Sequence, residues 1–136
     1  MKYLLDTNVC IALINDSSEK VRRRYVLAER EQASIAISTI ALHELYYGVA
    51  KSEHAARNTR ALAEFLHRDI ALLDFNSEDA RAASEIRAEL ERKGKRIGEY
   101  DTLIAGQALA RNMVLVTANT REFARVKGLV VEDWSV

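Results

Sequence analysis

Residues 1–14 read MKYLLDTNVCIALI, two short apolar runs separated by polar side chains. The first run, Lys2–Leu5, has the length of a buried strand, and the second, Val9–Ile14, follows a stretch that suits a helix cap. Similar short runs recur along the chain with helical patterns between them. Strands that alternate with helices pair in parallel through right-handed crossovers, so the sequence predicts an α/β fold with a mostly parallel central sheet. The predicted strands are Lys2–Leu5, Ser34–Ile37, Ile70–Leu73, Val114–Thr117 and Val130–Glu132.

The segments between these strands carry apolar residues at helical spacing. Residues 40–49 and 100–111 are apolar on nearly every side, so both helices are expected to be largely buried. Helices with a single apolar face are expected around residues 21–30, 62–66 and 80–90. The sequence has no proline and five glycines, with no repeat or linker-like stretch, so residues 1–136 are predicted to form one domain.

The composition is that of a folded chain, with 49% apolar and 29% charged residues. No apolar run reaches the roughly 20 residues that span a bilayer, and Asp6 interrupts the first run where a secretion signal needs apolar residues. The lone Cys10 forms no internal disulfide, so a cytoplasmic location is expected. Twenty basic and twenty acidic residues give a net charge of zero, which argues against tight nonspecific binding to nucleic acid.

Ligands of parallel α/β sheets bind at the carboxyl ends of the strands, and Asp6 lies just past the first strand. An ordinary interpretation is that Asp6 caps the following helix. Thr7 and Asn8 are equally able to supply that cap, so the cap alone does not require an aspartate. A functional role for Asp6 is therefore an equally good interpretation.

Two other carboxylates are expected in apolar helices and near Asp6. Glu44 has the alternative of an ion pair with an arginine, and Asp101 has the alternative of capping its helix after Gly98. Three converging carboxylates repel one another, and a hard dication relieves that repulsion, so Mg²⁺ or Mn²⁺ is the expected cofactor. The scattered residues His43, His54 and His67 do not suggest a zinc site.

A polar segment after the fourth strand, residues 117–123, is a further candidate part of this site. Asn119 or Thr120 has the alternative of capping a short helix there. In the functional interpretation Thr117 and Asn119 complete the site by hydrogen bonds, and Glu122 is a possible fourth acid for water or a second metal.

A basic run precedes Asp101 by only a few residues and is formed by Arg92, Lys93, Lys95 and Arg96. Cations at the end of a helix are favoured by its dipole, so a solvated helix end is the ordinary interpretation. Beside an acidic pocket, the same side chains are candidates for binding RNA phosphates.

Taken in order, these segments resemble the VapC toxins, which are PIN-domain ribonucleases of bacterial toxin–antitoxin pairs. Any one motif is weakly specific, but the resemblance covers essentially the whole chain in the same order and spacing. The matching segments are Leu4-Leu5-Asp6-Thr7-Asn8, Ile37-Ser38-Thr39-Ile40 with Glu44-Leu45, Gly98-Glu99-Tyr100-Asp101 with Leu103-Ile104-Ala105, Val116-Thr117-Ala118-Asn119-Thr120-Arg121-Glu122-Phe123, and Val131-Glu132-Asp133-Trp134.

The resemblance implies a single PIN domain over residues 1–136, an α/β/α sandwich with a central sheet of about five strands. It implies that Asp6, Glu44 and Asp101 form the acidic metal-binding triad, with Thr7 and Asn8 orienting Asp6. Glu122 stands where relatives usually carry a further Asp, which leaves the choice between one and two metals open.

The resemblance also implies an activity and partners. The segment 92–101 and the ending Glu132-Asp133-Trp134 are similar to the VapC branch that cleaves initiator tRNA in its anticodon stem-loop. The expected function is a Mg²⁺-dependent endoribonuclease that inhibits translation until a VapB antitoxin neutralises it. Homodimers and larger toxin–antitoxin complexes are implied, with operator DNA bound only through the antitoxin.

Other classes of protein place acids and Mg²⁺ at the same edge of a similar sheet. A phosphoacceptor receiver domain needs paired acids after the first strand, and here Asp6 stands alone. A phosphatase of the Asp-x-Asp type needs an aspartate where this chain has Asn8. A noncatalytic PIN scaffold remains an alternative, although the intact triad argues against it.

Overall fold

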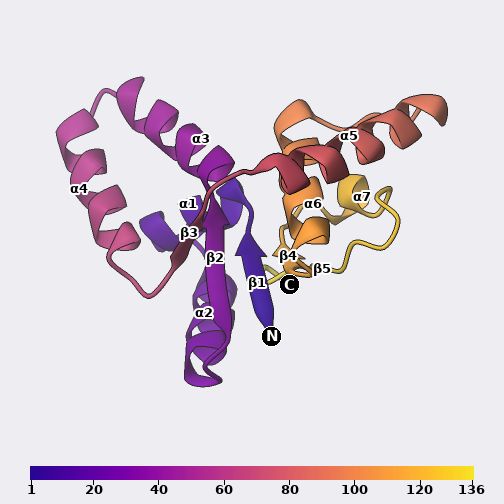
Figure 1. The fold of residues 1–136 in the computed structure, drawn as a ribbon. Coiled ribbons are helices and arrows are strands. Elements are labelled where there is room, and N and C mark those ends of the chain that lie inside the picture. The colour runs from indigo at the N-terminus through magenta and orange to yellow at the C-terminus, as the bar shows by residue number, and fades with distance from the viewer.

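A computed structural model describes residues 1–136, and its centre is a five-stranded sheet (Figure 1). All pairings are parallel, and the strand order is β3-β2-β1-β4-β5, so β1 lies in the middle. The five predicted strands are confirmed, with ends that differ by at most one residue. Their bounds are β1 Lys2–Leu5, β2 Ser34–Ser38, β3 Ala71–Leu73, β4 Val114–Val116 and β5 Val131–Glu132.

Helices cover both faces of this sheet and give the three layers of an α/β/α sandwich. The hydrophobic cluster on one face draws mainly on the first four helices, and the cluster on the other face draws mainly on the last three. The helices are α1 Thr7–Asn15, α2 Glu19–Arg30, α3 Thr39–Ala50, α4 Ala55–Leu66, α5 Ser77–Arg92, α6 Glu99–Ala110 and α7 Thr120–Phe123. None of them is long and apolar enough to cross a lipid bilayer.

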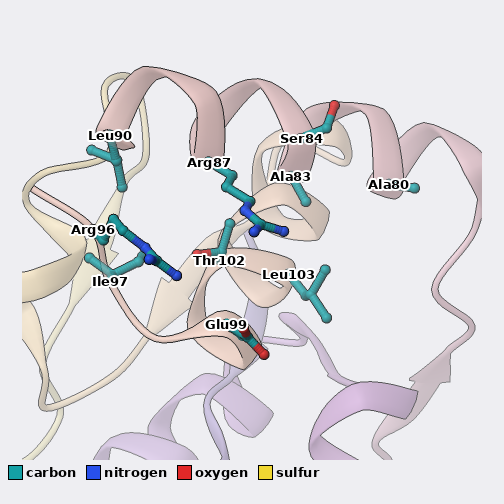
Figure 2. A pocket seen from close by; sticks show the side chains of 10 residues that line it. All are labelled: Ala80, Ala83, Ser84, Arg87, Leu90, Arg96, Ile97, Glu99, Thr102 and Leu103. Atoms are coloured by element: carbon teal, nitrogen blue, oxygen red, sulfur yellow. The ribbon is translucent and has the colours of Figure 1, made fainter. Parts of the chain in front are cut away.

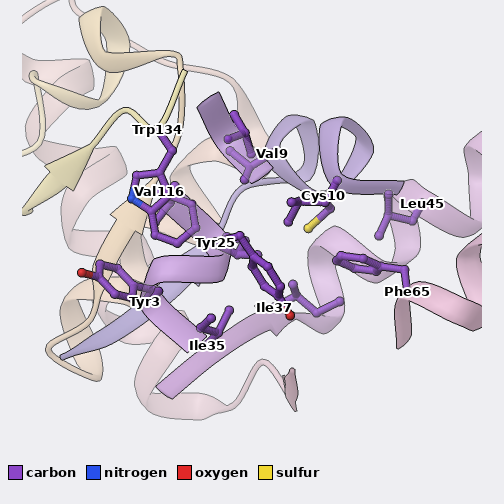
Figure 3. Packing of buried hydrophobic residues seen from close by; sticks show 14 of the residues in the cluster. Tyr3, Val9, Cys10, Tyr25, Ile35, Ile37, Leu45, Phe65, Val116 and Trp134 are labelled. Atoms are coloured by element: carbon purple, nitrogen blue, oxygen red, sulfur yellow. The ribbon is translucent and has the colours of Figure 1, made fainter. Parts of the chain in front are cut away.

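The alternation of side chains along β1 explains why both faces are apolar. Tyr3 and Leu5 pack with the first cluster, whereas Leu4 packs with the second. In Figure 3, Tyr3 and Trp134 lie together at one end of the first cluster, with ring centroids 5.2 Å apart. Phe65 lies at the other end of the cluster, against the helices (Figure 3). The central strands are therefore held from both sides, which fixes the position of the residue that follows β1.

The expected burial of residues 40–49 is wrong for most of helix α3. Only Ala41 and Leu45 are buried, and Tyr46 and Tyr47 are 55% and 60% exposed. Helices α3 and α4 form a hairpin at the β3 end of the sheet (Figure 1), so one face of α3 has no neighbour within the chain. The expected burial of the third strand is wrong as well, since Leu72 is 49% exposed because β3 is an edge strand.

The pairing of α5 with α6 includes a buried carboxylate that the sequence pattern does not single out. Asp79 is fully buried and accepts hydrogen bonds from the backbone of Asn76, the amide of Gln107 and the guanidinium of Arg111. Burial alone would raise the pKa of Asp79, but the bonds from Arg111, Asn76 and Gln107 outweigh it and lower the pKa. This carboxylate therefore stabilises the fold above its ordinary pKa and loses that contribution as the pH falls.

Helix α6 also makes a close backbone contact with α5 at Gly106. A Cβ atom there would lie 2.5 Å from the backbone nitrogen of Ala83, closer than packed atoms approach. We therefore expect Gly106→Ala to lower the free energy of unfolding by about 1–3 kcal/mol, although alanine is the better helix former. Urea denaturation followed by circular dichroism measures this. Gly48→Ala is the matched control, because a methyl group at Gly48 would meet no atom of another part of the chain within 4 Å, and it should be neutral or stabilising by up to about 1 kcal/mol.

Candidate metal centre at the carboxyl ends of the central strands

The candidate residues meet at one edge of the sheet because the strands are parallel. Asp6 directly follows the central strand β1, and Thr117 directly follows its neighbour β4. Glu44 lies on α3, Asp101 lies in the first turn of α6, and Glu122 lies on α7. Four segments far apart in the sequence, around residues 6, 44, 101 and 117–122, therefore contribute polar side chains to one place.

Asp6 is buried, and both of its carboxylate oxygens are held. One oxygen accepts a hydrogen bond of 2.8 Å from the backbone nitrogen of Thr7, and the other accepts one of 2.8 Å from the hydroxyl of Thr117. Asp6 is thus also the cap of α1, so the ordinary interpretation describes part of its role. Burial raises the pKa of Asp6, and the hydrogen bonds from Thr117 and Thr7 only partly offset it.

Thr7 connects this aspartate to the second acid. Its backbone nitrogen donates to Asp6, and its hydroxyl donates to the Oε1 atom of Glu44 over 2.8 Å. Asn8 differs from Thr7, because it is exposed and its side chain makes no hydrogen bond to Asp6. In this structure Thr7, and not Asn8, fixes the geometry around Asp6.

Asp101 is not a helix cap, so that alternative is wrong. Gly98 occupies the cap position of α6, without a side-chain hydrogen bond, and Asp101 stands three residues further on. The pKa of Asp101 is raised to about 6, first by burial and then by the negative charges of Asp6, Glu122 and Glu44. A hydrogen bond with Glu122 raises it further. These four carboxylates therefore repel one another in a shared electrostatic environment.

The loop after β4 ties the fourth acid to the first. The hydroxyl of Thr117 donates to Asp6 and accepts a hydrogen bond of 3.0 Å from the backbone nitrogen of Asn119. The side-chain amide of Asn119 in turn donates to the carboxylate of Glu122. Asn119 makes no side-chain cap to α7, so its amide is committed to Glu122. The chain from Asp6 to Glu122 is therefore continuous through hydrogen bonds.

The donor set at this site suits a hard dication. All of its charged groups are carboxylates, and the raised pKa of Asp101 shows a repulsion that a cation would relieve. No group of three or more Asp, Glu, His or Cys side chains is already placed to hold a metal ion. A bound ion would therefore need side-chain movement or bridging water, and Mg²⁺ usually keeps several waters. His43 packs edge-on against Tyr100, with ring centroids 5.9 Å apart.

The basic run is not a uniform patch. Arg92 and Lys93 lie at the end of α5 and pair with Glu89 over 2.5 Å and 3.1 Å. The ordinary interpretation, a solvated helix end, therefore fits these two residues. Lys95 is exposed and has no ion-pair partner. Arg96 differs from them, because its side chain lines a cavity beside the start of α6.

The repulsion at Asp101 predicts a trade-off between stability and function. Because the folded-state pKa of about 6 exceeds the ordinary value of 3.8, the charged carboxyl destabilises the fold above about pH 6, and this penalty disappears towards pH 4. We expect metal-free Asp101→Asn to be more stable than the parent at pH 7.5 by about 1 kcal/mol, allowing for solvent screening of a half-buried group.

Thermal melts of both proteins in EDTA between pH 4 and pH 8 measure this difference, which should appear as a rise in Tm of about 4 °C at pH 7.5 and vanish near pH 4. Glu99→Gln, which removes an exposed charge two residues away that the helix dipole favours, is the control and should not raise the melting temperature. Equal stability of the Asp101→Asn variant and the parent across the whole range would contradict the repulsion.

Comparisons with known proteins agree with this architecture. The PIN domain family model matches residues 3–129. The chain is 44% identical over 135 residues to the tRNA(fMet)-specific endonuclease VapC of Shigella flexneri, covering 99% of both chains. It is 42% identical over 134 residues to the tRNA(fMet)-specific endonuclease VapC of Salmonella typhimurium, covering 98% of both.

Solved structures give the same result. The fold is similar to VapBC2 from Rickettsia felis bound to a promoter DNA fragment, with a TM-score of 0.92, 40% identity, and coverage of 98% of this chain and 99% of that one. It is also similar to DNA-bound VapBC from Salmonella typhimurium, with a TM-score of 0.87, 42% identity, and coverage of 98% of both chains.

Proposed function

The chain belongs to the VapC family of PIN-domain proteins, and from this premise we propose that it is a metal-dependent endoribonuclease that cleaves tRNA. The observation that carries the proposal is the coupling of four carboxylates around Asp101, at the end of the sheet where ligands of this fold class bind. Such repulsion destabilises the metal-free protein, whereas a bound dication would neutralise it. Nucleases with a PIN domain generally depend on a divalent metal, and Mg²⁺ or Mn²⁺ fits an all-oxygen donor set.

Asp6 and Asp101 are the proposed direct ligands, and Glu44 holds the ion through water or accepts a proton. Thr7 and Thr117 fix the two oxygens of Asp6, so the ligand is oriented before the ion arrives. Glu122 accepts a hydrogen bond from Asn119, and we propose that it supports a water or a second ion. When bound, the metal supplies charge for the phosphate and a more acidic water.

The chain's own residues then account for the remaining steps of hydrolysis. Glu44 accepts the proton of the attacking water while Thr7 holds its carboxylate in place. In-line attack forms a bond from the water oxygen to phosphorus and breaks the bond to the 3′ oxygen, which takes a proton from solvent, so the products have 5′-phosphate and 3′-hydroxyl ends. Participation of the ribose 2′-hydroxyl would instead give a cyclic phosphate, which the proposal excludes.

The substrate and partners follow from the relatives. Two relatives carry the name tRNA(fMet)-specific endonuclease, which favours initiator tRNA as the target, cut in its anticodon stem-loop. Structures of VapBC complexes on DNA favour a VapB antitoxin that neutralises the enzyme, with operator DNA contacted only through that antitoxin. We thus propose that the chain is one cytoplasmic PIN domain, which acts as a homodimer and is bound by antitoxin in larger toxin–antitoxin complexes.

Cleavage of purified tRNAs tests the proposal. The protein, freed of antitoxin, is incubated with initiator and elongator methionine tRNAs in Mg²⁺ or in EDTA, and the fragment ends are mapped. We expect cleavage of the initiator tRNA in the anticodon stem-loop, in Mg²⁺ only, with 5′-phosphate ends. Equal cleavage in EDTA, or fragments that end in a cyclic phosphate, would refute metal-dependent hydrolysis.

A further inference from the structure

A cavity of about 350 Å³ lies between α5, the loop at residues 93–98 and the first turn of α6. This volume is within the range of small-molecule sites. Figure 2 shows that the side chains of Arg87, from α5, and Arg96, from the loop, both point into it. Its apolar wall includes Ala83, Ile97 and Leu103. The cavity therefore combines two cations with an aliphatic surface.

The two arginines differ from the other paired arginines of the chain in how they are paired. Both face the same carboxylate, Glu91, and the closest contact of each is through Nε, over 3.4 Å from Arg87 and 3.8 Å from Arg96. Their terminal Nη groups donate no hydrogen bond in the structure. Arg23 and Arg92, in contrast, each donate a hydrogen bond to a carboxylate through an Nη group. The fork that recognises phosphate is therefore free on Arg87 and Arg96.

The backbone near Arg96 is held in place by a second contact. The Arg125 side chain donates a hydrogen bond of 3.0 Å to the carbonyl oxygen of Arg96, and Ile97 next to it is buried in the second hydrophobic cluster. The loop is thus held at Arg96 and at the residue that follows it. A cation on a fixed backbone loses less freedom when it binds an anion than one on a free chain end.

The cavity and the carboxylate cluster share the first turn of α6. Thr102 follows Asp101 directly and Glu99 precedes it by two residues, and both line the cavity. Successive helix positions point about 100° apart, so these two side chains point roughly 100° and 200° away from Asp101, and the cavity lies around the helix from the carboxylates. Glu99 is the only carboxylate that lines the cavity, and it lies at the end of the cavity near the start of α6 (Figure 2).

We propose that this cavity binds one unpaired nucleotide of the RNA substrate that flanks the cut site, around the first turn of α6 from Asp101, with its phosphate on the Nη groups of Arg87 and Arg96. This inference rests on the proposed ribonuclease function and adds a substrate subsite to it. The ribose and base lie along Ala83, Ile97 and Leu103, as bases splayed out of RNA loops lie on protein surfaces. Glu99 accepts from the exocyclic amine of adenine, cytosine or guanine, which uracil lacks.

Binding measurements separate this subsite from catalysis. Fluorescein-labelled initiator tRNA is titrated in EDTA with Asp6→Asn protein, which leaves the RNA intact, and with the same protein carrying Arg87→Gln or Arg96→Gln. We expect each arginine substitution to raise Kd about tenfold and to reduce the slope of log K against log salt concentration by about 0.7. Arg30→Gln removes the same charge from an exposed, unpaired position on α2, away from the site, and should change neither quantity.

The possible outcomes separate the subsite from the proposed function. If the parent protein cleaves tRNA but Arg87→Gln and Arg96→Gln behave like Arg30→Gln, the subsite is refuted and the nuclease stands. If the two variants keep their RNA affinity but lose affinity for the antitoxin, the cavity belongs to the antitoxin and the subsite is again refuted. If the parent protein neither binds nor cuts tRNA, both the subsite and the proposed ribonuclease function are refuted. Thermal melts that match the parent show that each variant is folded.

Discussion

Asp6→Asn is expected to reduce the rate of tRNA cleavage at least 100-fold while leaving the protein folded. The substitution keeps the size of the side chain and one oxygen that accepts from the backbone nitrogen of Thr7, and its amide can donate to the hydroxyl oxygen of Thr117, but it removes the negative charge and one metal-binding oxygen. Since burial already raises the pKa of Asp6, the neutral side chain should not cost stability. Initial rates of cleavage in saturating Mg²⁺, with circular dichroism to check folding, measure the effect.

The control for this experiment is another aspartate outside the cluster. Asp69 is exposed, lies in the loop between α4 and β3, and forms no ion pair, so Asp69→Asn should cleave tRNA within twofold of the parent. A folded Asp6→Asn protein with the parent's rate would show that Asp6 has only its capping role.

Asp79→Ala is expected to lower the free energy of unfolding by about 3–5 kcal/mol, a loss as large as that expected from truncating a buried aromatic side chain. The change leaves the guanidinium of Arg111 and the amide of Gln107 without their carboxylate partner. It also removes the reciprocal hydrogen bonds with Asn76 that begin α5. A loss of this size would be a large part of the free energy of unfolding of a typical small domain, and it would come from one buried carboxylate and its partners.

Urea denaturation at pH 7 measures this loss. Glu78→Ala is the matched control, because Glu78 is exposed in the same first turn of α5 and should cost less than about 1 kcal/mol. A difference below about 1 kcal/mol between the two variants would contradict the stabilising role of the buried network. Activity adds a second readout, since α5 and α6 together position the turn that carries Asp101.

The strands and the candidate acids were predictable because each left a local signal. Short apolar runs such as Lys2–Leu5 marked the strands, and the rule for parallel sheets directed attention to Asp6. Burial was less predictable, because it depends on what covers a surface. The apolar residues of α3 predicted a buried helix, whereas Tyr46 and Tyr47 are exposed at one end of the sheet.

Contacts between residues far apart in the chain were hard to predict, because they leave little pattern in the local sequence. Asp79 resembled an ordinary acid in the first turn of a helix, and its partner Arg111 lies 32 residues later. The spacing of Asn76 and Asp79 is that of a capping box, which can be recognised in a sequence. The burial of the Asp79 side chain cannot be recognised in the same way. The basic run drew attention to Arg92 and Lys93, which pair with Glu89. Arg87 was missed because the chain turns between it and Arg96 before the two side chains meet at Glu91.

Binding of Mn²⁺ in the absence of RNA tests the metal site most directly, since it does not depend on finding the right substrate. Electron paramagnetic resonance at pH 7.5 counts the free ion as Mn²⁺ is titrated into the parent protein and into Asp6→Asn. The parent should bind at least one ion per chain, and the variant should bind it at least tenfold more weakly. Equal affinity in the two proteins, or no bound ion in a parent that still cuts tRNA, would contradict a metal centre built around Asp6.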